Sequence, residues 1–104
     1  MQEISVSELK TRLDNGDDIQ VIDIREDYEV EIATLGGEHL PMGEVMDNLD
    51  KIRKDCDVIV HCRSGARSGN VVTYLTQNGY DNLYNLTGGI LAWSAEIDST
   101  VPQY

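Results

Sequence analysis

The chain has 104 residues, 19 of them acidic and 8 basic, which gives a formal net charge of −11. Wide contact with nucleic acid or with an anionic membrane needs a basic surface, so this charge argues against both partners. The length allows one domain, and no stretch approaches the ~18 consecutive apolar residues of a membrane-spanning helix. The acidic start, Met1 to Ser5, lacks the basic and apolar regions of a signal peptide. We therefore expect a single domain, residues 1–104, in the cytoplasm.

The first half of the chain is predicted to begin with a helix. Ser5 and Glu8 form a capping box at its start, and Leu9 and Leu13 are spaced to lie on one face. Residues 19–24 are β-branched and apolar almost without interruption, which is typical of a strand buried in a parallel sheet. The other elements expected here are a helix over 27–33, an extended piece over 38–40, and one helix or two helical turns over 42–54.

The second half repeats the alternation of strand and helix. Residues 57–61 are the clearest strand, and a helix over 68–78, a strand over 82–86 and a helix over 90–97 follow. This alternation predicts an α/β fold, with a mostly parallel central sheet of about five short strands and helices on both faces.

The sequence contains two cysteines, Cys56 and Cys62. A strand between them would separate their Cα atoms by about 20 Å, and a disulfide needs about 7 Å or less, so both should be free. Two cysteines and two histidines without a CxxC pair do not make a zinc ligand set, so we expect no metal site.

The segment from His61 to Ser68 (HCRSGARS) joins a predicted strand to a predicted helix. Ligands of open α/β sheets bind at the carboxyl ends of strands, where this segment lies. Its glycine and small residues allow backbone N–H groups to turn inward and bind an anion, and the following helix adds its positive end. The residues expected to bind an anionic substrate are Arg63, Ser64, Gly65, Ala66, Arg67 and Ser68.

Cys62 stands at the mouth of this loop and is the predicted nucleophile. N–H donors, the helix end and two guanidinium groups should lower the pKa of its thiol. A buried, inert Cys62 is the simpler alternative, but it would not require the glycine and arginines that follow. Cys56 lies between Asp55 and Asp57, which raise the pKa of a thiol, so we expect it to be structural. Adjacent strand residues point to opposite faces, so His61 should pack beneath the loop.

Three stretches of the sequence resemble the rhodanese-like domain family, in the family's order. Residues 21–26 (VIDIRE) are similar to its early strand, residues 60–68 to its active loop, and residues 84–93 (YNLTGGILAW) to its late strand, Gly-Gly turn and helix. The resemblance covers essentially the whole chain and implies the rhodanese-like fold. Residues 28–33 and the ending 102–104 are most similar to the rhodanese domains fused to adenylating enzymes of molybdopterin and thiamine sulfur-carrier pathways.

The resemblance implies a sulfurtransferase of the thiosulfate:cyanide type. Cys62 would take sulfane sulfur from thiosulfate or a protein persulfide, hold it as a persulfide, and pass it to a thiophilic acceptor. Arg63 and Arg67 would help to bind the donor, and the loop amides would hold the persulfide. Asp23 and Arg25 would support the loop. The resemblance implies no metal or organic cofactor, and it implies a small anionic sulfur donor, with a cysteine desulfurase or a sulfur-carrier protein as a protein partner.

Three other functions stay open. Cysteine phosphatases place five residues between Cys and Arg, whereas four separate Cys62 from Arg67, and a phosphoryl group needs the wider loop. A non-catalytic rhodanese-like binding module usually lacks the active cysteine, which is present here. A redox-sensing thiol is disfavoured because no resolving cysteine is evident.

Overall fold

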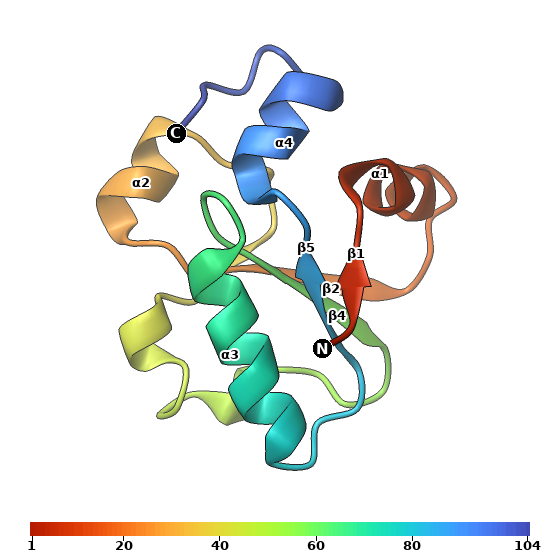
Figure 1. Cartoon of the computed structure of the whole chain (residues 1–104), viewed down its shortest axis with the longest axis vertical. Coiled ribbons are helices and arrows are strands. Elements are labelled where there is room, and N and C mark those ends of the chain that lie inside the picture. The colour runs from red at the N-terminus through yellow and green to blue at the C-terminus, as the bar shows by residue number, and fades with distance from the viewer.

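A five-stranded sheet runs through the computed structural model, which describes residues 1–104 (Figure 1). All neighbouring strands are parallel, so the predicted parallel α/β fold is confirmed. The strands, in their spatial order, are β1 (Glu3–Ile4), β5 (Leu83–Leu86), β4 (Asp57–His61), β2 (Ile19–Asp23) and β3 (Glu38–His39). The helices are α1 (Val6–Asp14), α2 (Asp27–Ile32), α3 (Ala66–Gln77) and α4 (Gly89–Glu96), with two 3-10 turns, η1 (Met42–Glu44) and η2 (Leu49–Lys51).

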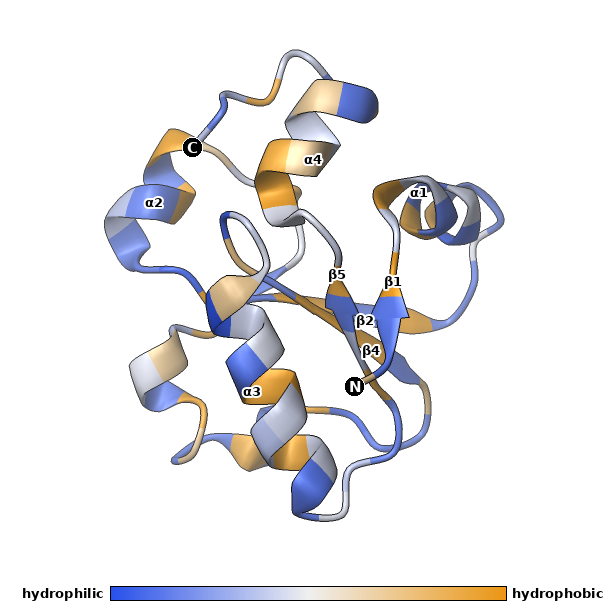
Figure 2. Cartoon of the chain, viewed as in Figure 1, coloured by the Kyte–Doolittle hydropathy of each residue, from blue (hydrophilic) through white to orange (hydrophobic).

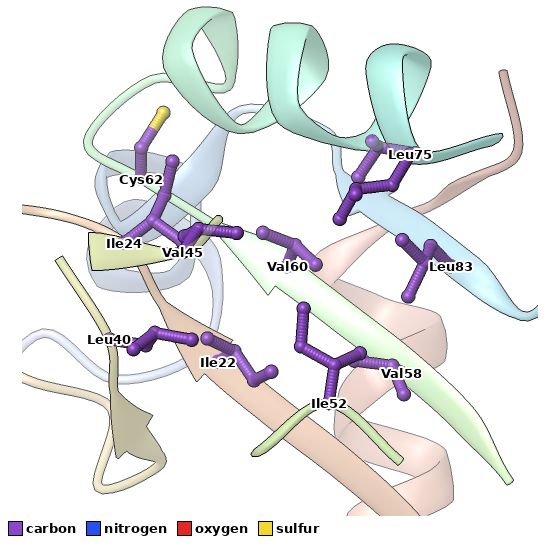
Figure 3. Packing of buried hydrophobic residues seen from close by; sticks show 11 residues of the cluster. Ile22, Ile24, Leu40, Val45, Ile52, Val58, Val60, Cys62, Leu75 and Leu83 are labelled. Atoms are coloured by element: carbon purple, nitrogen blue, oxygen red, sulfur yellow. The ribbon is translucent and has the colours of Figure 1, made fainter. Parts of the chain in front are cut away.

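Both faces of the sheet are covered by other elements. Successive side chains of β4 point to opposite faces, so they pack in two separate core clusters. Val58 and Val60 belong to a core cluster with residues of α3 and of the segment that carries η1 and η2 (Figure 3). Ile59 belongs to a second cluster with residues of α1 and α4. Figure 2 shows that β4 is hydrophobic over most of its length, whereas α2 is mostly hydrophilic.

Most element bounds agree with the predictions, including the Ser5–Glu8 capping box and the two helical turns within 42–54. Three details differ. β1 was not predicted, because two residues are too short to show a period; it pairs with the edge of β5. α3 begins at Ala66, two residues early, because Gly65 has a left-handed φ of 107° and lets the helix start inside the loop. Leu13 lies on the same face as Leu9, where both line one cavity, but it is 45% exposed.

No helix combines the length and apolar character needed to cross a membrane.

Candidate active site

The loop after β4 folds around the sulfur of Cys62. Backbone N–H groups of Gly65 and Ser68 donate to Cys62 Sγ at 3.1 and 3.5 Å, and the Ser68 hydroxyl lies 3.3 Å from it. Cys62 is 1% exposed and closes one end of the core cluster. Figure 3 shows its sulfur directed away from the packed side chains of Ile24 and Val45. The loop is therefore a small cup whose donors converge on a single sulfur atom.

These donors favour the thiolate form of Cys62. Burial alone raises the pKa of this thiol, but hydrogen bonds from the Ser68 side chain and from the N–H groups of Ser68, Gly65 and Ser64 outweigh it, so the pKa is lowered. The predicted direction is confirmed, and the largest lowering contributions come from local N–H and O–H donors rather than from the two arginines. Cys56 is also free. The pKa of the Cys56 thiol is raised, mainly by burial and further by nearby aspartates.

Asn85 of β5 fixes the geometry of the cup. Its side-chain Nδ2 donates to the Gly65 carbonyl at 3.1 Å, which directs Oδ1 toward the Ser68 hydroxyl. That hydroxyl carries one hydrogen, so it can donate to Asn85 or to Cys62 Sγ but not to both. A negative charge on the sulfur strengthens the second bond, so Ser68 can respond to ionisation of Cys62.

The first turn of α4 holds the loop from the other side. The backbone N–H groups of Ile90 and Leu91 donate to the carbonyls of Cys62 and Arg63, at 3.0 and 3.1 Å. This approach requires Gly89, where a Cβ atom would lie 2.6 Å from the Cys62 carbonyl oxygen and where φ is +58°. The Gly-Gly turn thus serves close packing of the loop against α4.

The two loop arginines have different partners. The Arg67 guanidinium binds the Glu29 carboxylate through two hydrogen bonds of 2.7 and 2.9 Å. Arg63 is exposed and forms no ion pair; its guanidinium lies 5.5 Å from the centre of the Tyr104 ring. The charge of Arg67 is therefore balanced, and Arg63 is the free cation of the loop.

Glu29 is buried and was not predicted from the sequence. Its carboxylate also accepts a hydrogen bond from the Glu26 N–H at 3.1 Å, which completes a capping box at the start of α2. Arg67 is the main reason that the pKa of this carboxyl is lowered from 4.5 to about 2. Glu29 thus ties α2 to the first turn of α3 next to the cup.

Asp23 and Arg25 lie beneath the loop, buried at the carboxyl end of β2. Arg25 is fully buried and binds both carboxylate oxygens of Asp23. Its remaining donors reach the carbonyl oxygen of Ala33, at 2.6 Å, and the main-chain oxygen of Tyr104, at 3.0 Å. The pair therefore connects the sheet to α2 and to the end of the chain. This position suits the predicted supporting role.

His61 is fully buried next to this pair. Its Nδ1 is 3.4 Å from the Cys62 carbonyl oxygen, and Nε2 lies 3.9 Å from Asp23 Oδ2 without a hydrogen-bond partner. Burial lowers the pKa of His61. The ring packs beneath the loop, as expected, and does not contact the Cys62 sulfur.

Cys62 does not line any of the surface cavities. One of about 280 Å³ is lined by residues of α3 and of the η1 segment, among them Val45, Val71 and Tyr74. None is lined by a residue of the segment 62–68.

Comparison with known proteins identifies the family. The family model described as Rhodanese-like domain matches residues 5–96. A sulfurtransferase from Allochromatium vinosum is 39% identical over 95 residues, which cover 90% of this chain and 89% of that protein. A rhodanese-like domain protein from Staphylococcus aureus has a crystal structure with a TM-score of 0.84 and 32% identity, over 100% of this chain and 99% of that one. The predicted family is confirmed.

Other relatives are much longer than this chain. It spans 38% of a chloroplastic rhodanese-like/PpiC domain-containing protein from Arabidopsis thaliana, to which it is 35% identical. It spans 26% of a probable adenylyltransferase/sulfurtransferase, MoeZ, from Mycobacterium tuberculosis, at 27% identity. A member of the branch predicted from the sequence is therefore among the relatives, at a lower identity than the Allochromatium sulfurtransferase.

Proposed function

The chain belongs to the rhodanese-like domain family, and we propose that it is a sulfurtransferase that carries sulfane sulfur on Cys62 as a persulfide. One observation carries the proposal: the N–H groups of Gly65 and Ser68 and the Ser68 hydroxyl all surround Cys62 Sγ. They stabilise a sulfur anion, which is both the attacking thiolate and the persulfide product. The sulfurtransferase among its relatives, of nearly the same length, supports the same chemistry.

In the first step, the Cys62 thiolate attacks the outer sulfur of thiosulfate. A bond forms between the two sulfur atoms, the original S–S bond breaks, and sulfite leaves with its electron pair. The reaction conserves charge, because one thiolate becomes one persulfide anion. Arg63 is exposed and has no acidic partner, so in this proposal it is the loop cation that is free to bind the sulfonate group of the donor.

In the second step, a thiophilic acceptor attacks the outer sulfur of the persulfide. With cyanide the products are thiocyanate and the regenerated Cys62 thiolate. The thiolate and the persulfide each carry one negative charge, so the N–H and O–H donors of the loop can stabilise both states.

A protein persulfide, such as that of a cysteine desulfurase, can supply the sulfur in place of thiosulfate in this proposal. A relative named putative sulfur carrier protein, from Bacillus subtilis, supports a sulfur-carrier protein as acceptor. Two cysteines without a disulfide suit a reducing compartment, which supports the cytoplasm as the site of action.

The test is thiocyanate production from thiosulfate and cyanide. We expect activity in the wild type and in Cys56→Ala, and none in Cys62→Ala, because only Cys62 lies in the donor cup. Hydrolysis of a phosphate ester, measured on the same samples, should be absent. Thiocyanate formation that survives Cys62→Ala would refute the proposal, and so would a wild type that accepts sulfur neither from thiosulfate nor from a cysteine desulfurase.

A further inference from the structure

The free cation of the loop is held by a residue far away in the sequence. The Arg63 guanidinium forms no ion pair and lies over the Tyr104 ring, 5.5 Å from its centre. An exposed arginine without a partner samples many rotamers and loses that freedom when it binds an anion. A ring beneath the guanidinium restricts it beforehand and leaves its positive charge and N–H donors available.

Tyr104 is itself anchored to the core. Its main-chain oxygen accepts a hydrogen bond of 3.0 Å from the fully buried Arg25, which is fixed by Asp23. Its ring meets that of Tyr28 edge to face, with 6.2 Å between the centres and 70° between the planes. The ring beneath Arg63 is therefore held by the core and by α2.

We propose that Tyr104 is a positioning residue that holds the Arg63 guanidinium at the rim of the Cys62 cup, where it binds the anionic sulfur donor. This inference rests on the proposed function and deepens it, since it assigns recognition of the donor to one side chain and its support. Tyr104 acts only through Arg63. Its loss should therefore affect the half-reaction with a donor that carries a sulfonate group and not the half-reaction with a thiol acceptor that lacks one.

The kinetic test compares two ratios, kcat/KM for thiosulfate and kcat/KM for dithiothreitol, a dithiol acceptor that carries no sulfonate group. In a two-step exchange each ratio reports only its own half-reaction. We expect Tyr104→Leu to lower the ratio for thiosulfate roughly two- to fivefold, the value of an exposed cation–π contact, and to leave the ratio for dithiothreitol unchanged. Tyr104→Phe keeps the ring and should retain the wild-type ratio.

Two further variants separate positioning from general damage. Tyr80→Leu removes the other cation–π contact in the chain, with Lys54 at 5.0 Å, away from the loop, and should change neither ratio. In an Arg63→Gln background, Tyr104→Leu should cause no additional loss, because the group that it positions is gone. An equal loss of both half-reactions, or an undiminished effect in the Arg63→Gln background, would overturn the proposal.

A spectroscopic measurement decides the proposal independently of activity. The side-chain protons of Arg63 should show a ring-current shift in the wild type and in Tyr104→Phe, and should lose it in Tyr104→Leu. Unchanged Arg63 resonances in Tyr104→Leu would refute the positioning role. A wild type that has these shifts but takes no sulfur from any donor would instead refute the proposed function and leave the Tyr104–Arg63 contact established.

Discussion

The ion pair between Glu29 and Arg67 predicts a pH-dependent contribution to stability. Folding lowers the pKa of the Glu29 carboxyl from 4.5 to about 2. At about 1.4 kcal/mol for each pKa unit, this difference corresponds to about 3 kcal/mol. Because the Arg67 side chain is 36% exposed, solvent screening reduces the expected contribution to about 2 kcal/mol.

The sign follows from the lowered pKa. A carboxyl that ionises more readily in the folded state stabilises it above the ordinary pKa of 4.5, and this stability is lost as the pH falls toward about 2. Glu29→Gln mimics the protonated side chain. The variant should therefore be less stable than the wild type by about 2 kcal/mol at neutral pH, with a difference that shrinks from about pH 4.5 downward.

Urea unfolding followed by the fluorescence of Trp93, at neutral pH and at several acidic pH values, measures this difference. Glu31→Gln is the matched control, because Glu31 lies on the same helix and is exposed. It should change stability by no more than about 0.5 kcal/mol at any of these pH values. A Glu29→Gln effect that is absent at neutral pH, or that stays constant into the acidic range, would refute the reasoning.

Three further substitutions test the cup and its support. Ser68→Ala should raise the pKa of the Cys62 thiol, because the Ser68 side chain is the strongest of the groups that lower it; thiolate absorbance against pH measures this, and an unchanged pKa would contradict it. Gly89→Ala should lower kcat/KM by about 10²-fold, because its Cβ would displace the Cys62 carbonyl; near wild-type activity would show that the loop does not need this close approach. Leu75→Ala should cost about 2–5 kcal/mol in urea unfolding, because Leu75 is 1% exposed in the core, and a cost below about 1 kcal/mol would contradict the packing described.

The sequence predicts those strands, turns and helix starts that depend on consecutive residues. The apolar residues Val58–Val60 predict β4 directly, and the glycine and small residues after Cys62 predict a turn lined by N–H groups. Helix starts follow from local capping, as with Ser5 and Glu8. These features depend on neighbours in the chain, so hydrophobic pattern and turn chemistry are enough to find them.

The features that the sequence did not predict depend on contacts between distant residues. Glu29 is one of 19 acidic residues, and nothing nearby in the sequence marks it as the partner of Arg67. Tyr104 lies next to Arg63, 79 positions after Arg25, which binds its main-chain oxygen. Asn85 offered a signal, as a polar residue within the strand Leu83–Leu86, but its partner Ser68 becomes evident only when β5 lies beside the loop.

The different roles of Arg63 and Arg67 also depend on contacts between distant residues. Two cations near one cysteine predict a positive loop, and both were expected to lower the pKa of its thiol. The fold instead assigns Arg67 to Glu29 and leaves Arg63 free. Hydrogen-bond donors within the loop supply the largest stabilisation of the thiolate. Only the packing of α2 against the loop separates these roles.

The most direct test of persulfide formation on Cys62 is an intact-mass measurement after incubation with thiosulfate, followed by peptide mapping. The account predicts the addition of one sulfur atom, located on Cys62, present in Cys56→Ala and removed by cyanide. A sulfur atom found on Cys56, or a wild-type mass that changes neither with thiosulfate nor with a cysteine desulfurase as donor, would contradict it.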